Sequence, residues 1–194
     1  MRKRVAILIS GRGSNMAALI EAGKAPDYPA EIVLVLSKVA DAGGLARARD
    51  AGLATEVIAH KPFGKDREAF DRAVNAALEN HRIEIVCLAG FLRVLTPWFV
   101  ARWNGRLINI HPSLLPAFKG LDTHARAIAA GATQHGATVH FVVPELDSGP
   151  VIAQESVDVL PGDTADTLAA RVLAVEHRIY PLALRRVAEG KFAG

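Results

Sequence analysis

The sequence lacks several features that would place the protein in a specialised class. Its 194 residues include a single cysteine, Cys87, so the chain cannot form an intramolecular disulfide. A lone cysteine suits a reducing compartment, and we expect a cytoplasmic protein. No apolar run approaches the roughly 18 residues that a membrane-spanning helix needs. The basic opening residues are followed by an apolar run too short for a signal peptide.

The sequence also lacks a concentrated block of charge. Lysine and arginine number 23 against 20 acidic residues, and the formal net charge of +3 is scattered along the chain. Proteins that bind a long nucleic acid usually gather basic residues on one face. We therefore expect small, phosphate-bearing ligands, with neither nucleic acid nor a membrane as a partner. Repeats, linkers and low-complexity tracts are also missing, which favours one domain over residues 1–194.

What the sequence does contain is a regular alternation of short apolar runs and helical patterns. Apolar runs typical of buried parallel strands occupy residues 4–10, 31–37, 54–59, 83–90 and 106–110. Helical patterns lie between them, at residues 16–23, 42–52, 65–82 and 96–105. This alternation predicts an α/β fold with an open, mostly parallel twisted sheet and helices on both faces.

Beyond residue 112 the pattern changes. It predicts a helix over residues 123–131 and a hairpin of strands 136–143 and 151–159. A long helical tail follows over residues 162–190, with Asp163 or Thr164 as its N-cap. We expect Pro181 to kink or divide this helix.

The first candidate site is the glycine-rich turn at residues 10–15, between the first strand and the first helix. Glycines allow several backbone N–H groups to converge on one anion at a helix N-terminus. The turn lacks the Gly-Lys-Ser/Thr of a P-loop and the third glycine of a dinucleotide fingerprint. We interpret it as a phosphate cradle for a mononucleotide-like ligand; the alternative is a plain tight turn.

The second candidate site is Asn109 and His111, at the end of the fifth predicted strand. Residues two apart on a strand face the same side, and open α/β sheets bind ligands beyond their carboxyl ends. An amide donor beside an imidazole suits acyl transfer, because one group stabilises an oxyanion and the other moves a proton. The alternative for His111 is a core histidine whose hydrogen bonds are satisfied.

The third candidate is Asp147, in the Gly/Pro turn of the predicted hairpin. Such an acid is usually a solvated turn residue, but a hairpin that brought it to an imidazole would raise the pKa of that imidazole. We expect no metal site, since His124, His135 and His140 lack ligand spacing. Cys87 is expected to be inert core, and Ser113 lacks the elbow motif of a nucleophile.

Several ordered motifs together resemble the folate-dependent phosphoribosylglycinamide formyltransferases of purine biosynthesis. The motifs are ILISGRGSN (7–15), VCLAGFLRVLTPWFV (86–100), INIHPSLLPAFKG (108–120) and HGATVHFVVPELDSGPVI (135–152). The resemblance runs over nearly the whole chain. It implies 10-formyltetrahydrofolate as co-substrate and glycinamide ribonucleotide as the formyl acceptor. It also implies a mononucleotide-binding half over about residues 1–105 and a catalytic, folate-binding half over about 106–194.

The resemblance implies specific roles for residues of this chain. Asn109 would be the oxyanion donor, His111 the general acid and base, and Asp147 the residue that tunes the pKa of His111. The implied ribonucleotide contacts are Gly13, Ser14, Asn15 and Glu176. The implied folate contacts are Arg67, Leu92, Arg93, Val94, Leu95 and Asn109. Two residues depart from the pattern: Ser148 replaces a glycine found in many members, and Asp122, to which we assign no role, replaces a histidine found in some.

Two rival interpretations remain at this stage. Methionyl-tRNA formyltransferases and formyltetrahydrofolate hydrolases share the HPSLLP motif, but each carries an added domain for which 194 residues leave no room. A non-catalytic nucleotide-binding module would explain the glycine turn but not the set of Asn109, His111 and Asp147. The sequence leaves the choice between a monomer and a homodimer open.

Overall fold

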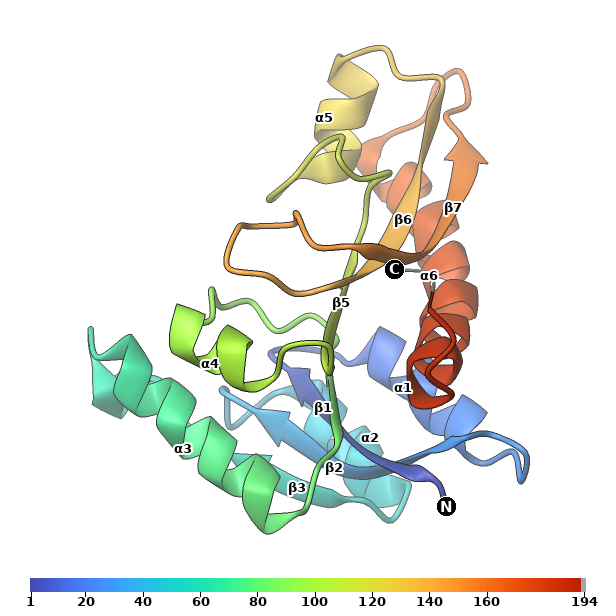
Figure 1. Ribbon diagram of the computed structural model, residues 1–194. Coiled ribbons are helices and arrows are strands. Elements are labelled where there is room, and N and C mark those ends of the chain that lie inside the picture. Colours follow the sequence, from blue (N-terminus) through green and yellow to red (C-terminus); the bar gives the residue numbers. More distant parts are fainter. Residues whose placement is uncertain (193–194) are drawn as a thin grey trace.

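The computed structural model describes residues 1–192, in which seven strands form one sheet (Figure 1). Their order across the sheet is β3-β2-β1-β4-β5-β6-β7. The strands are β1 (Lys3–Ile9), β2 (Ala30–Ser37), β3 (Ala54–Val57), β4 (Ile85–Leu88), β5 (Leu107–His111), β6 (Gln134–Phe141) and β7 (Val151–Asp158). Strands β1 to β5 pair in parallel, and β6 pairs antiparallel with both β5 and β7. The predicted open, mostly parallel sheet and the C-terminal hairpin are confirmed.

Helices cover both faces of this sheet, as predicted. They are α1 (Ser14–Gly23), α2 (Gly43–Asp50), α3 (Arg67–Asn80), α4 (Pro97–Arg102), α5 (Thr123–Ala129) and α6 (Ala165–Ala188), with a short 3-10 helix η1 (Lys61–Phe63). One core cluster joins alternate strand residues to α1, α2 and α6, and a second joins the intervening ones to α3 and α4. Strand β1 shows the division: Ile7 belongs to the first cluster and Leu8 to the second, and both are fully buried.

Helix α6 is continuous over 24 residues, so the expectation that Pro181 divides it is wrong. Its apolar stripe, which includes Leu168, Val172 and Ile179, is buried in the first core cluster. Each such side chain contributes about 1.5–3 kcal/mol on burial. That packing outweighs the roughly 3 kcal/mol that a proline costs inside a helix. Thr164 is the N-cap and accepts a hydrogen bond from the Thr167 backbone N–H.

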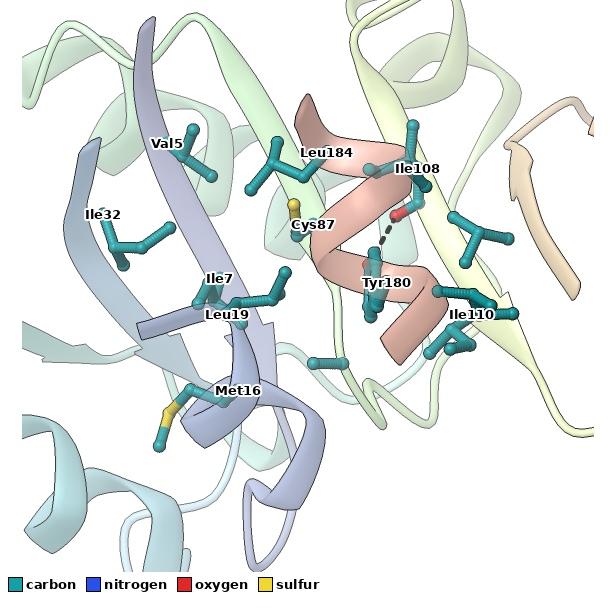
Figure 2. Packing of buried hydrophobic residues seen from close by; sticks show 14 of the residues in the cluster. Val5, Ile7, Met16, Leu19, Ile32, Cys87, Ile108, Ile110, Tyr180 and Leu184 are labelled. Carbon is teal, nitrogen blue, oxygen red and sulfur yellow. Dashed lines mark hydrogen bonds between the residues drawn. The ribbon is translucent and has the colours of Figure 1, made fainter. Parts of the chain in front are cut away.

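Tyr180 connects α6 to the two central strands nearest the candidate site. The side chain is fully buried, and its hydroxyl lies 2.8 Å from the Leu88 carbonyl oxygen and 3.3 Å from that of Ile108. Figure 2 shows the ring reaching from α6 toward Ile108 among the apolar side chains of the core. Leu88 ends β4, and Ile108 directly precedes Asn109. The hydroxyl therefore connects the last residue of β4 with the residue of β5 that precedes Asn109.

The order of the strands reverses direction at β1. From β1 the chain moves outward to β2 and β3, then returns to place β4 on the other side of β1. Ligands of open α/β sheets bind at such a reversal, beyond the carboxyl ends of the strands. Within residues 1–192, no helix is both long and apolar enough to cross a membrane.

Candidate active site

The glycine turn after β1 leads directly into the first turn of α1. Gly13 has a φ of 71°, in the left-handed region, and precedes the helix as its N-cap. A Cβ at this position would lie 3.1 Å from the backbone Cα of Gly44, so glycine meets both a conformational and a steric requirement. No side chain caps the helix. The N–H groups of its first turn can therefore face an anion.

Residues of α1 and α6 meet beside this turn. The Asn15 side-chain amide donates a 2.9 Å hydrogen bond to Glu176 Oε2. Burial raises the pKa of Glu176, and the hydrogen bond from Asn15 partly opposes that rise. Ser14 and Glu176 line a surface pocket that also includes Arg12 and His124. The structure thus brings together Gly13, Ser14, Asn15 and Glu176, which the resemblance assigns to the ribonucleotide.

Asn109 and His111 project from the end of β5. Strand alternation places them on the side of the sheet where Leu107 packs with α3 and α4, while Ile108 and Ile110 face α6. His111 is 6% exposed, and its Nε2 lies 2.9 Å from the Phe118 carbonyl oxygen. A carbonyl can only accept, so Nε2 carries a proton.

Asp147 approaches His111 from the hairpin turn. Its Oδ2 lies 3.5 Å from His111 Nδ1 and accepts a 2.9 Å hydrogen bond from the Gly120 backbone N–H. Asp147 is only 9% exposed, unlike a solvated turn residue. The turn needs Gly149 nearby, because a Cβ there would collide with the Phe141 carbonyl oxygen. Since Nε2 donates to the Phe118 carbonyl, Nδ1 is the ring nitrogen of His111 that can take up and release a proton, and it faces the Asp147 carboxylate.

His140 is part of this cluster, although the sequence suggested no such role for it. It pairs with Asn109 across β5 and β6, and its Nε2 lies 3.4 Å from Asn109 Nδ2 and 3.8 Å from Asp147 Oδ1. Its Nδ1 lies 2.9 Å from the Phe141 carbonyl oxygen. Burial lowers the pKa of His140 more than Asp147 raises it. The neutral ring therefore donates from Nδ1 and accepts at Nε2.

Four of the residues that the resemblance assigns to folate, residues 92–95, lie in the loop between β4 and α4. Arg67, at the start of α3, donates a 2.7 Å hydrogen bond to the Val94 carbonyl oxygen. Leu92 and Val94 are exposed, whereas Leu95 is buried. The Arg93 guanidinium stacks 4.1 Å above the Phe70 ring and lies against α3. Because the Arg93 side chain is held against α3, this residue can meet a ligand only through its backbone.

The other side chains that the sequence raised make structural contacts or lie outside the cluster of Asn109, His111 and Asp147. Cys87 is fully buried, and burial raises the pKa of its thiol. The Ser113 hydroxyl donates to the Ala117 carbonyl oxygen at 2.6 Å. Asp122 is exposed, with a φ of 55°. His124 and His135 face each other, with 3.2 Å between His124 Nδ1 and His135 Nε2. Across residues 1–192, no group of three potential metal-ligating side chains is found.

The fold and its matches to known proteins place the chain in the formyl-transferring class. The chain belongs to the formyl transferase family, whose model matches residues 3–184. Members of this family use a formyl-folate as co-substrate in general. Within it, the chain is a member of the phosphoribosylglycinamide formyltransferase group, since it is 47% identical to the Escherichia coli enzyme of that name over 187 residues. That match covers 96% of this chain and 88% of the relative.

Solved structures and longer relatives agree with this placement. A phosphoribosylglycinamide formyltransferase from Brucella melitensis is 55% identical, with a TM-score of 0.93 and full coverage of both chains. The corresponding structure from Coxiella burnetii is 44% identical, with a TM-score of 0.92 over 98% of this chain and 89% of that one. The trifunctional purine biosynthetic protein adenosine-3 of Bos taurus is 51% identical over 189 residues. The match covers 97% of this chain but only 19% of that relative's length.

Proposed function

We propose that this protein transfers the formyl group of 10-formyltetrahydrofolate to the amine of glycinamide ribonucleotide, a step of de novo purine biosynthesis. The observation that carries the proposal is the cluster of Asn109, His111 and Asp147 at the carboxyl edge of the sheet. The pocket is lined by α1 and α6, which pack on one face of the sheet, and the loop of residues 92–95 leads into α4 on the other face. Two substrates bound there would meet at the cluster.

The ribonucleotide would bind at the start of α1. Backbone N–H groups of Gly13, Ser14 and Asn15 would donate to its phosphate, favoured by the helix dipole. Glu176, fixed by its hydrogen bond from Asn15, can accept from hydroxyl groups of the ribose. The glycinamide arm would then extend toward the end of β5.

The folate would bind along the loop that joins β4 to α4. Backbone groups of residues 92–95 would pair with the pterin, and the exposed side chains of Leu92 and Val94 would cover its apolar face. Arg67 already bonds this loop and would lie near the acidic tail of the folate. The formyl group on N10 would then be held over Asn109 and His111.

The reaction requires a new carbon–nitrogen bond, the loss of an old one and the movement of one proton. The substrate amine attacks the formyl carbon, and the carbonyl oxygen becomes an oxyanion. Asn109 Nδ2 has two hydrogens: one is directed to His140 Nε2, and the other can donate to the oxyanion. Such a donor typically contributes about 10²–10³ in rate. Holding the two substrates together supplies much of the remaining acceleration.

His111 would carry the proton. It accepts the proton released by the attacking amine and returns it to N10 as the carbon–N10 bond breaks, directly or through water. Asp147 would fix the ring and balance its positive charge from 3.5 Å. None of these steps calls for a metal ion. We further propose that residues 1–194 act as one formyltransferase domain in the cytoplasm, where Cys87 stays reduced.

One assay tests the proposal against its rivals. The protein is incubated with 10-formyltetrahydrofolate and either glycinamide ribonucleotide, charged initiator methionyl-tRNA or water alone, and loss of the formyl group is followed by absorbance. We expect rapid transfer to the ribonucleotide without ATP. Preferential transfer to the tRNA or to water would replace the proposal with the corresponding rival activity. No reaction with any acceptor would leave a binding module as the better interpretation.

A further inference from the structure

The pocket between α1 and α6 has an uneven distribution of charge. The side formed by α6 carries Asp166 and Glu176 with small or apolar side chains, including Leu173, and contributes no basic residue. The rest of the lining consists of Arg12, Ser14, Pro112 and His124. A phosphate bound at the start of α1 would therefore meet two carboxyl groups across the pocket. Such a site needs a positive charge, because like charges oppose binding at close range.

His124 is a poor source of that charge. Burial lowers the pKa of His124, and the nearby His111 lowers it further, so the ring is neutral near pH 7. Backbone N–H groups at a helix N-terminus add only partial charge. Among the residues that line the pocket, Arg12 is therefore the one with a lasting positive charge.

Arg12 combines a fixed backbone with a free side chain. The Gly11 carbonyl oxygen accepts a 3.0 Å hydrogen bond from the Gly44 N–H, and Gly43 lies close enough that a Cβ there would touch Arg12 Cα. The turn thus packs directly on α2. The Arg12 side chain is exposed and makes no hydrogen bond or ion pair with any residue in the described range 1–192. Its guanidinium can therefore turn toward a ligand without breaking an existing contact.

We propose that Arg12 pairs with the phosphate of the ribonucleotide and makes the pocket selective for a phosphorylated acceptor over the corresponding nucleoside. A planar guanidinium donates two parallel hydrogen bonds to a phosphate, and such charge-assisted bonds are stronger than neutral ones. This inference rests on the proposed function, which places the ribonucleotide in this pocket.

The test compares Arg12→Gln with the wild-type protein on two acceptors, glycinamide ribonucleotide and its dephosphorylated riboside. We expect the substitution to raise the KM for the ribonucleotide by about tenfold to a hundredfold, the usual effect of a charge-assisted bond. The KM for the riboside should not change, and Arg12→Lys should restore part of the loss. Arg47→Gln is the matched control, since Arg47 is an exposed arginine on α2 that does not line the pocket.

Two outcomes would overturn the inference: an equal loss on both acceptors, or an unchanged KM for the ribonucleotide. Calorimetry with ribose 5-phosphate separates this result from failure of the proposed function. If no acceptor is formylated but Arg12→Gln alone weakens ribose 5-phosphate binding, the phosphate contact stands and the proposed reaction falls. If ribose 5-phosphate binds the wild type and Arg12→Gln equally, or binds neither, the contact itself is refuted.

Discussion

Asn109 and His140 face each other across β5 and β6, with 3.4 Å between Asn109 Nδ2 and His140 Nε2. His140 Nδ1 donates to the Phe141 carbonyl oxygen, so its Nε2 presents a lone pair and can only accept. Asn109 must therefore turn its nitrogen, and not its oxygen, toward His140. The register of an antiparallel pair thus fixes which way the candidate oxyanion donor points.

Replacing His140 should therefore act through Asn109. We expect His140→Leu to lower kcat about tenfold or more, because the amide loses the acceptor that orients it. In an Asn109→Ala background the same change should cost little further, since coupled residues are not additive. Steady-state kinetics of the two single variants and the double variant give the coupling. Fully additive losses would show that His140 acts independently of Asn109.

His111→Ala should remove the proton carrier while leaving the ribonucleotide pocket intact. General acid–base catalysis typically contributes about 10²–10⁴ in rate, so kcat should fall at least a hundredfold. Affinity for glycinamide ribonucleotide, measured by calorimetry, should stay within a few-fold of the wild type. A near-normal kcat would remove His111 from the mechanism.

Asp147→Asn tests the charge beside His111. The substitution keeps the size and the tolerance of a left-handed backbone, since Asp147 has a φ of 47°. It removes the anion 3.5 Å from Nδ1, and we expect kcat to fall by at least tenfold. Asp122→Asn is the control, because Asp122 also has a positive φ but is exposed. Equal effects of the two substitutions would point to a backbone effect and not to the charge.

Tyr180→Phe tests whether α6 positions the end of β4 and the residue of β5 that precedes Asn109. Loss of the hydroxyl leaves the buried Leu88 and Ile108 carbonyls without this donor, which costs about 1–3 kcal/mol of stability. We also expect a several-fold loss of kcat, because Asn109 follows Ile108. Tyr28→Phe removes a comparable bond to the same helix, from the Tyr28 hydroxyl to the Pro181 carbonyl oxygen. Thermal melting should fall in both variants, and kcat only in Tyr180→Phe.

Buried histidines should make the fold sensitive to acid. Burial lowers the pKa of His135 to about 4, and repulsion from the neighbouring imidazoles of His124 and His111 when they are protonated adds to the effect. An unfolded histidine has a pKa near 6.5. As pH falls from about 6.5 to about 4, His135 therefore binds a proton in the unfolded chain but not in the folded protein. The free energy of unfolding falls as a result.

Urea unfolding at several pH values between 7.5 and 4.5 measures this slope. His135→Gln should flatten it, because the substituted side chain does not titrate. Glu176, whose pKa is raised by burial, works in the opposite direction, so the comparison between variant and wild type is more informative than the wild-type curve alone. An identical slope in both proteins would contradict the assignment to His135.

Local signals predicted most of the fold. The apolar runs at residues 4–10 and 31–37 became β1 and β2 because a strand buried on both faces leaves a continuous apolar pattern. The expectation that Pro181 divides α6 was wrong, because the buried stripe of the helix outweighs the local cost of a proline. That balance depends on the sheet beneath α6, which a local pattern does not contain.

For the candidate site too, some residues were predictable from local sequence and others were not. Asn109 and His111 are two residues apart on one strand, so their shared face follows from sequence alone. The role of Asp147 depended on the hairpin turn folding back toward His111. The sequence did not show whether the turn does so. His140 enters the site through its pairing with Asn109, 31 positions away, beside a register shift between Val139 and His140 in the β6–β7 pair. Such long-range register could not be derived from spacing.

The fully buried thiol of Cys87 makes the chain a convenient host for spectroscopic labels. Burial raises the pKa of this thiol, and only the thiolate reacts quickly with alkylating reagents. A cysteine introduced at an exposed position such as Ser148 would therefore be the one site modified in the native protein. Conversely, the slow rate at which Cys87 itself is alkylated would report how often the central strands open. This measurement of sheet dynamics needs no substitution.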